Sequence, residues 1–173
     1  PKAGQKAMVY GATGAIGSAY VQLFKYYGLY VTAVCGGENF ELVRSWGADK
    51  LIDYKTRDFT KDKEKYDYVF DAVGKTNFFK CKTLLNKKGQ FASSAGLVNM
   101  FLAMITPLFG GKRVLFKAPK DIAGELRFIR GLVELGKFKP VIDRKYPLEK
   151  IAEAYTYVAS GQKIGNVIIT MGD

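Results

Sequence analysis

The sequence predicts an α/β fold: a six-stranded, mostly parallel, doubly wound sheet in the middle of three layers, followed by a C-terminal strand–helix–strand tail. Two observations support this fold class. Short apolar runs alternate with amphipathic helical patterns over most of the 173 residues, and such alternation produces parallel strands joined by right-handed crossovers. Hydrophobic residues make up 48% of the chain, which is enough to fill the core of one domain of this length.

The strands are identified by short runs of apolar or β-branched residues. Residues 30–35 (YVTAVC) show the β-branched enrichment, and residues 66–72 carry apolar side chains packed as in a buried strand. In chain order, the predicted strands of the sheet span residues 6–10, 30–35, 51–52, 66–72, 89–93 and 113–117, and the tail adds strands at 140–146 and 166–170.

The helices are identified by apolar residues at helical spacing. Residues 121–135 are the strongest amphipathic case, and a short helix at 39–46 closes on Gly47. The predicted helices span residues 16–27, 39–46, 75–85, 121–135 and 148–159. A further apolar segment, 97–109 (LVNMFLAMITPLF), is too short to cross a bilayer and contains Pro107, so we interpret it as part of the core or of an interface.

A glycine-rich turn joins the first predicted strand to the first predicted helix. It consists of Gly11, Ala12, Thr13, Gly14, Ala15, Ile16 and Gly17. Its glycines permit a tight turn and a close approach of the backbone to a pyrophosphate, and the helix N-terminus offers N–H groups and the positive end of its dipole. In a doubly wound sheet this turn lies beside the topological switch point. We therefore predict the dinucleotide site of a Rossmann fold; the alternative is a turn that binds no ligand.

The end of the second strand indicates which dinucleotide binds. NAD sites normally carry Asp or Glu there, bonded to the ribose 2′-hydroxyl, whereas this strand ends on Gly36 and Gly37. Their backbone N–H groups, with Asn39 and Tyr54, are suited to a 2′-phosphate, which favours NADP(H). Glu38 is the alternative contact, to the ribose of NAD(H), although we interpret it as charge in the first turn of a helix.

The ends of the fourth and fifth strands complete the predicted site. Ala72, Val73 and Gly74 end the fourth strand, and Ser94 and Gly96 follow the fifth. The carboxyl edge of a parallel sheet lines the crevice in which the nicotinamide and its ribose bind. The alternative for both glycines is that they only turn the chain.

The residue types exclude several kinds of chemistry. The chain has no histidine and two cysteines, Cys35 and Cys81, so it cannot form the usual Cys/His zinc site or a nucleophile activated by histidine. Cysteines so far apart, with no visible signal peptide, favour a reducing cytoplasm. The net charge of +11 comes from lysines interleaved with acids, as in residues 61–65, which is typical of a solvated surface. We therefore expect neither a nucleic acid nor a membrane as a partner.

The chain resembles the cofactor-binding half of the medium-chain dehydrogenase/reductase superfamily, in its zinc-independent, quinone-reductase-like branch. The resemblance covers nearly the whole chain. Besides the glycine turn, it rests on residues 34–36, 47–54, 71–74, 136–143 (GKFKPVID), 146–154 (YPLEKIAEA) and 165–169 (GNVII). It implies ribose-phosphate contacts at Gly36, Asn39 and Tyr54. NADP-preferring relatives often have Ser and Lys at the first two of these positions, and only Tyr54 keeps the pattern.

The resemblance also implies an activity and an incomplete chain. Relatives transfer a hydride between the nicotinamide and a quinone, enone or carbonyl, without a metal, and no catalytic residue is expected in this half. They begin with a barrel-like catalytic domain, so we expect a fragment that is inactive alone. In it, residues 1–138 bind the cofactor and 139–173 would complete the missing domain. Relatives commonly dimerise through an edge strand, here residues 113–117.

Two other interpretations start from the same residues. The glycine turn also resembles extended short-chain dehydrogenases, which use a Tyr-x-x-x-Lys pair within one helix, and Tyr146 and Lys150 have that spacing. We reject this pair as catalytic because Pro147 favours a strand end before it and a new helix after it. A non-enzymatic nucleotide-sensing module stays open as an alternative, because a fold alone does not prove catalysis.

Overall fold

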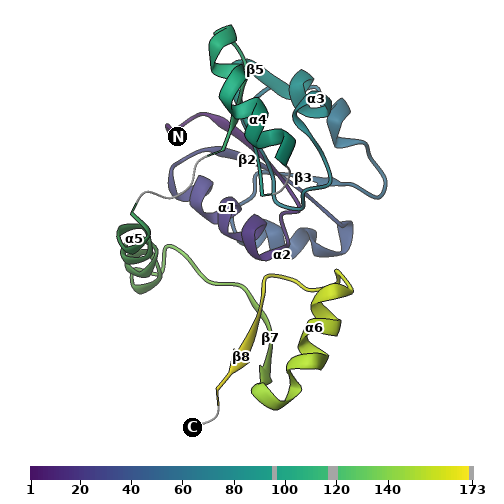
Figure 1. Cartoon of the computed structure of the whole chain (residues 1–173), viewed down its shortest axis with the longest axis vertical. Coiled ribbons are helices and arrows are strands. Elements are labelled where there is room, and N and C mark those ends of the chain that lie inside the picture. Colours follow the sequence, from purple (N-terminus) through teal and green to yellow (C-terminus); the bar gives the residue numbers. More distant parts are fainter. Residues whose placement is uncertain (95–96, 117–120, 172–173) are drawn as a thin grey trace.

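The main body of the protein is a six-stranded sheet (Figure 1), seen in a computed structural model that describes residues 1–94, 97–116 and 121–171. The strand order is β3-β2-β1-β4-β5-β6, and every neighbouring pair is parallel. The strands are β1 (Lys6–Tyr10), β2 (Tyr30–Cys35), β3 (Lys50–Asp53), β4 (Tyr66–Asp71), β5 (Leu85–Ser93) and β6 (Arg113–Leu115). This is the order of a doubly wound sheet with its switch point between β1 and β4, so the predicted fold class is confirmed.

Helices and 3₁₀ turns connect the strands. The helices are α1 (Ala15–Tyr26), α2 (Phe40–Ser45), α3 (Phe78–Cys81), α4 (Leu97–Ile105), α5 (Ile122–Glu134) and α6 (Ile151–Ala159). The 3₁₀ turns are η1 (Gly37–Asn39), η2 (Phe59–Lys61), η3 (Lys82–Leu84), η4 (Thr106–Phe109) and η5 (Leu148–Lys150). Among the described residues, no helix has both the length and the apolar character needed to cross a membrane.

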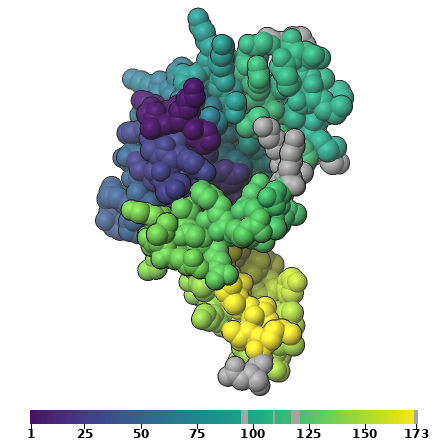
Figure 2. Space-filling view, turned by 90° about the vertical axis from the view of Figure 1, so that its left-hand side faces the viewer, coloured from purple at the N-terminus to yellow at the C-terminus, as the bar shows by residue number. Residues whose placement is uncertain are grey.

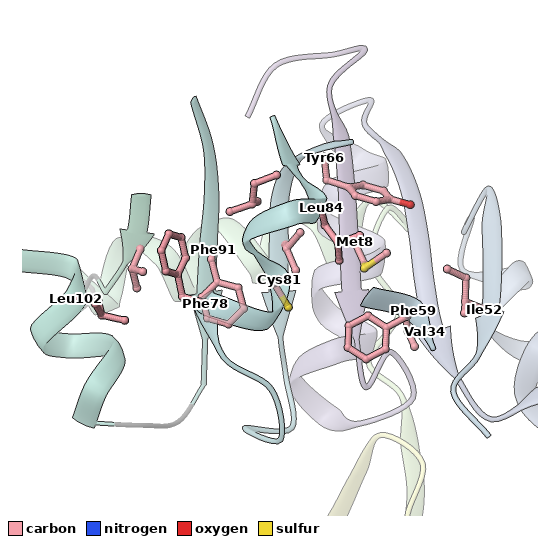
Figure 3. Close-up of a cluster of buried hydrophobic side chains, with 13 residues drawn as sticks. Met8, Val34, Ile52, Phe59, Tyr66, Phe78, Cys81, Leu84, Phe91 and Leu102 are labelled. Carbon is pink, nitrogen blue, oxygen red and sulfur yellow. The ribbon is translucent and has the colours of Figure 1, made fainter. Parts of the chain in front are cut away.

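Two separate hydrophobic cores lie on the two faces of the sheet. Successive side chains of a strand point to opposite faces, so Met8 of β1 enters one core while Ala7 and Val9 enter the other. In the first core, Leu102 of α4 and Phe78 of α3 pack with Phe91 of β5 (Figure 3). Burial on both faces is what a parallel sheet requires, because helices cover both sides.

The helix predicted at residues 75–85 is wrong in length. The structure has only the short α3 and the turn η3 there, and Leu85 already belongs to β5, opposite Tyr66 of β4. The Asn77 side chain accepts a hydrogen bond from the backbone N–H of Lys80 at 3.1 Å, so the helix begins only after Asn77. The apolar Leu84 and Leu85 that suggested a continuing helix are instead buried in the core beneath the sheet.

The C-terminal tail forms its own small sheet. Strands β7 (Ile142–Pro147) and β8 (Asn166–Thr170) pair in parallel with each other, and within the described residues they pair with no strand of the main sheet. Helix α6 connects them (Figure 1). The predicted helix 148–159 consists of the 3₁₀ turn η5 over its first three residues and of α6 over the rest. Tyr146 lies in β7 and Lys150 in η5, so the rejected Tyr-x-x-x-Lys pair does not share a helix. The domain boundary after residue 138 stays a prediction.

The last strand of the main sheet is shorter than predicted. β6 ends at Leu115, and Phe116 lies beyond it with an exposed side chain, while Lys117 falls outside the described residues. The predicted strand 113–117 therefore pairs with β5 over three residues only. β6 does form an edge of the sheet, as expected, and its pairing with a second copy stays a prediction.

Candidate functional site

The glycine turn packs so tightly that side chains are excluded from it. Gly11 has a φ of +79°, and a Cβ added to it would collide with the Cγ2 of Val73. A Cβ on Gly17 would collide with the carbonyl oxygen of Gly11 and lie 2.8 Å from its carbonyl carbon. The N–H of Gly14 donates to the same carbonyl oxygen at 3.1 Å. Glycines at positions 11 and 17 thus bring helix α1 directly against the end of β1.

The N-terminus of α1 is arranged as an anion site. The helix is capped by Gly14, which has no side chain to occupy the first N–H groups, and its first turn contains no acidic residue. The first intrahelical bond runs from the N–H of Ser18 to the carbonyl of Gly14 at 2.9 Å. The N–H groups of Ala15, Ile16 and Gly17 come before that bond and belong to the set that a helix leaves for a ligand.

The buried carboxylate of Asp71 shapes the loop on the other side of the switch point. Asp71 ends β4, and its side chain accepts hydrogen bonds from the backbone N–H groups of Val73 at 2.9 Å, Gly74 at 2.8 Å and Thr76 at 3.0 Å. Its backbone carbonyl accepts from the N–H of Ser94 at 2.9 Å. Asp71 therefore positions three predicted site residues, although it was not itself predicted as a site residue.

The predicted ribose contacts lie at the ends of β2 and β3, and acidic groups lie among them. A Cβ on Gly36 would fall 2.5 Å from a carboxylate oxygen of Glu38, and one on Gly37 would fall 2.8 Å from the Oδ2 of Asp53. Tyr54, which follows β3, is half exposed beside Tyr10, with ring centroids 6.5 Å apart. Gly36 is buried and Gly37 is half-buried, and both are bordered by negative charge.

A lysine that the sequence analysis missed balances this charge. The Nζ of Lys55 lies 2.7 Å from the Oε1 of Glu38. The hydrogen bond from Lys55 is the main reason that the pKa of Glu38 lies below its usual value, and the same bond raises the pKa of Lys55. Both side chains are exposed, so the pair is open to exchange with a ligand phosphate. The proximity of Lys55 to Glu38 depends on the β2–β3 pairing, which local sequence patterns did not indicate.

The C-terminal tail touches the glycine turn, which the sequence did not indicate. The N–H of Gly165 donates to the carbonyl of Thr13 at 2.7 Å, and Gly165 forms an isolated parallel bridge with Gly14. The carbonyl of Gly165 accepts a hydrogen bond from the Nζ of Lys163 at 2.7 Å. The segment that enters β8 therefore lies against the predicted phosphate turn and brings a cation close to it.

The structure brings most of the predicted site residues to one edge of the sheet. The turn from Gly11 to Gly17 and the loop from Ala72 to Gly74 meet through the packing of Gly11 on Val73, and Ser94 is tied to Asp71. The group of Gly36, Gly37, Asn39 and Tyr54 lies at the same edge, just after the carboxyl ends of β2 and β3. Gly96 lies outside the described residues. The ligand contacts of all these residues stay predictions.

Comparisons with known proteins agree with this arrangement. A family model described as zinc-binding dehydrogenase matches residues 46–169. The chain is 34% identical over 168 residues to the chloroplastic quinone-oxidoreductase QR1 of Triphysaria versicolor, covering 94% of this chain and 51% of that protein. It is 33% identical over 171 residues to the chloroplastic NADPH-dependent alkenal/one oxidoreductase of Arabidopsis thaliana, covering 96% of this chain and 41% of that protein.

The fold agrees with that of solved structures as well. The structure of the quinone oxidoreductase from Coxiella burnetii superposes with a TM-score of 0.85 at 21% identity, covering 99% of this chain and 54% of that one. The chain thus spans about half the length of the relatives that it matches. At this level of identity, the structural likeness supports the fold alone.

The zinc in the name of the matching family does not suit the residues of this chain. In the described part of the chain, no group of three or more His, Cys, Asp or Glu side chains is placed to hold a metal ion. Cys35 and Cys81 lie in opposite cores of the sheet, and burial raises the pKa of each thiol to about 11. Neutral, separated thiols are poor zinc ligands.

Proposed function

The chain belongs to the zinc-binding dehydrogenase family of the medium-chain dehydrogenase/reductase superfamily, and from this membership we propose that it is the NAD(P)H-binding part of an oxidoreductase. The reaction proposed for the whole protein is hydride transfer between a nicotinamide and a quinone, enone or carbonyl substrate. The relatives' names describe quinone and alkenal/one oxidoreductases. They support an oxidoreductase, and the substrate is part of the proposal.

One observation carries the proposal: two glycines without room for a Cβ hold the N-terminus of α1 against the carboxyl end of β1, at the switch point of the sheet. A turn with only a structural role does not require the first N–H groups of the helix to face the crevice without a capping side chain. A pyrophosphate requires this arrangement, because its negative charge is stabilised by backbone N–H groups and the helix dipole.

Different groups of described residues would bind different parts of the dinucleotide. The N–H groups of Ala15, Ile16 and Gly17 would hold the pyrophosphate, and the loop that Asp71 organises would position the nicotinamide ribose. When bound, the dinucleotide supplies the hydride at its nicotinamide ring. The chain's own contribution is to bind the cofactor, to fix its orientation and to keep water from one of its faces.

The cofactor proposed is NADP(H) in preference to NAD(H). Lys55 and the backbone N–H groups of Gly36 and Gly37 would receive the 2′-phosphate. Glu38 weakens binding of the 2′-phosphate, because a carboxylate repels a phosphate. In the free protein, Lys55 neutralises the Glu38 carboxylate through an ion pair of 2.7 Å. Binding of the phosphate would therefore exchange the Glu38–Lys55 pair for a phosphate–Lys55 pair.

Fluorescence titration with NADPH and with NADH tests both parts of the proposal. We expect tighter binding of NADPH, and we expect Glu38→Gln to strengthen NADPH binding by about two- to fivefold, the range of an exposed charge interaction. Glu41→Gln is the matched control. Glu41 lies three residues after Glu38 and is paired with Arg44, so the substitution removes the same charge outside the predicted ribose site. It should change neither affinity.

Other outcomes have distinct meanings. Tighter NADH binding that weakens in Glu38→Gln would assign the ribose contact to Glu38 and contradict the NADP preference, while keeping the dinucleotide site. If neither cofactor binds, the titration is repeated on the protein extended by the N-terminal domain of its relatives. Failure there as well would contradict the dinucleotide site. The extended protein should also oxidise NADPH in the presence of an enone or a quinone.

A further inference from the structure

The charge of the chain is concentrated in one segment. Residues 72–120 contain nine of the 27 lysines and arginines and none of the 16 acidic residues, so they hold +9 of the net charge of +11. The rest of the chain is close to neutral. This segment includes helix α4 and the turn η4, which protrude from the sheet in the upper part of Figure 1.

The inner face of α4 carries the polar residues of its segment. Asn99 and Thr106 are the only polar residues of 97–109, and both are buried. The hydroxyl of Thr106 donates to the carbonyl of Leu102 at 2.7 Å and accepts from the N–H of Val114 at 3.0 Å. Leu102 packs in the core with Val114. The inner face of α4 is therefore attached to β6 by apolar packing and by hydrogen bonds.

The outer face of α4 is apolar and uncovered by the described residues. It consists of Val98, Phe101 and Met104 of α4 and continues to Leu108 of η4. We call these four residues the α4 face, and each of their side chains is between 63% and 82% exposed. They recur at spacings of three, three and four, so they form one stripe opposite the buried side of the helix. A helix in water normally places polar side chains on that side. Contiguous exposed apolar surface marks an interaction site.

Three lysines line a hollow at one end of this stripe. Lys82, Lys87 and Lys112 surround a surface hollow of about 410 Å³, together with Phe78, Thr106 and Gly111. The Nζ of Lys112 donates to the carbonyl of Lys82 at 2.7 Å, which attaches the Lys112 side chain to the start of η3. Thr106 belongs both to the hollow and to the segment that carries the α4 face. Apolar and cationic surfaces are therefore adjacent; the region lies at the upper right of the molecule in Figure 2.

We propose that the α4 face and the lysine hollow dock the protein on an anionic lipid bilayer, with α4 lying in the plane of the interface. An interfacial helix buries its apolar side chains at the level of the headgroups while nearby lysines bind lipid phosphates. Charge disfavours a second copy as the occupant of this surface, because its own lysine hollow would meet the same three lysines. The predicted pairing of β6 with a second copy would use backbone groups of the edge strand instead. A nucleic acid would leave the apolar stripe uncovered. The expectation of no membrane partner was based on lysines interleaved with acids, as in residues 61–65, whereas residues 72–120 contain no acid.

Vesicle binding by the whole 173-residue chain tests the proposal. We expect the chain to sediment with phosphatidylcholine vesicles that contain phosphatidylserine, to bind pure phosphatidylcholine vesicles less, and to lose binding as salt screens the lysines. Lys87→Gln should lower the partition coefficient about fivefold, the effect of one cation near an anionic surface. Arg127→Gln, an exposed cation on α5 outside the acid-free segment, should have little effect.

A second set of variants tests the apolar stripe. Met104→Gln and Leu108→Gln should each weaken vesicle binding, whereas Leu126→Gln, at an exposed leucine of α5, should not. These side chains lie outside the core, so thermal unfolding should be unchanged in all three. Leu108→Trp adds a second tryptophan to the chain's single one, and its emission should shift to the blue when phosphatidylserine vesicles are added.

Several results would overturn the proposal. The first is no sedimentation with anionic vesicles. The second is binding that inorganic phosphate abolishes at constant ionic strength and that Met104→Gln leaves unchanged, which would indicate a phosphate site instead of a docking surface. The third is concentration-dependent self-association that Met104→Gln removes, without vesicle binding, which would assign the α4 face to a second copy of the chain.

Discussion

At the scale of single residues, the absence of a methyl group decides whether the turn can form. Gly17 and Gly131 both lie within helices, but a Cβ at position 17 would collide with the carbonyl of Gly11, while a Cβ at position 131 would meet nothing within 4 Å. The same substitution therefore has opposite consequences at the two positions. This contrast separates the effect on the turn from the general effect of glycine on a helix.

We predict that Gly17→Ala abolishes dinucleotide binding and destabilises the fold, because α1 must move away from β1. Gly131→Ala should leave binding unchanged and stabilise the fold by about 1 kcal/mol, the difference in helix propensity between the two residues. Cofactor titration and urea unfolding of both variants measure these effects. Normal binding by Gly17→Ala would mean that the turn does not hold the phosphates.

At the scale of elements, a buried ionic network connects three strands at the amino end of the sheet. Asp62 is 5% exposed and accepts hydrogen bonds from Lys50 of β3 at 2.8 Å and from Tyr66 of β4 at 2.5 Å. The hydroxyl of Tyr66 lies 3.1 Å from the Oγ1 of Thr32 in β2. Burial acts to raise the pKa of Asp62, but the bonds from Lys50 and Tyr66 outweigh it and leave the pKa below its ordinary value of 3.8.

The depressed pKa gives this network a pH dependence. A carboxyl group with a lower pKa in the folded state contributes stability above its unfolded pKa, about 3.9, and loses it as the pH falls through the folded value. We predict that Asp62→Asn lowers the free energy of unfolding at neutral pH by on the order of 2 kcal/mol, because Tyr66 and Lys50 lose a buried carboxylate while Lys50 keeps its bond to Glu64 at 2.8 Å. The difference from the wild type should shrink below pH of about 4.

Asp58→Asn is the matched control for this prediction. Asp58 is half exposed and caps η2 by accepting from the N–H of Thr60 at 3.0 Å, and Asn caps almost as well as Asp. Its unfolding free energy should stay close to that of the wild type. Equal losses in the two variants, measured by urea unfolding across the pH range, would contradict a special role for the network.

At the scale of the whole molecule, the tail holds the glycine turn from outside the main sheet. Gly165 has a φ of +72°, and a Cβ on it would collide with the carbonyl of Val141, while its N–H bonds Thr13 at 2.7 Å. Gly161 has the same φ but nothing within 4 Å of its Cβ position. The two glycines therefore share a left-handed backbone conformation and differ only in the contact that a side chain would break.

We predict that Gly165→Ala weakens dinucleotide binding as well as stability, because the tail must withdraw from Thr13 and Gly14. Gly161→Ala should cost only the strain of a left-handed alanine, about 1 kcal/mol, and should leave binding unchanged. NADPH titration and urea unfolding of both variants measure this. If the two variants bind NADPH equally well, the contact between the tail and the turn has no part in the site.

The sequence by itself determined the fold class and the place of the candidate site. The glycine turn, the β-branched strand at residues 30–35 and the helix at 121–135 were predictable because turn chemistry and side-chain periodicity act over a few neighbouring residues. The same local reasoning failed at residues 75–85, where apolar residues at helical spacing are buried in a turn and the start of a strand. Periodicity alone cannot distinguish a helix from a short apolar run that the core requires.

Only the tertiary structure decided the contacts between segments far apart in the chain. Asp71 organises the loop after β4, Lys55 pairs with Glu38, and Gly165 rests on Thr13, and none of these pairings has a local signal in the sequence. Which apolar residues of 97–109 stay outside was likewise unpredictable, because both sides of α4 carry apolar side chains and the polar Asn99 lies on the buried side. The side of α4 that is buried is the one that packs against β6, because burial depends on what a helix packs against.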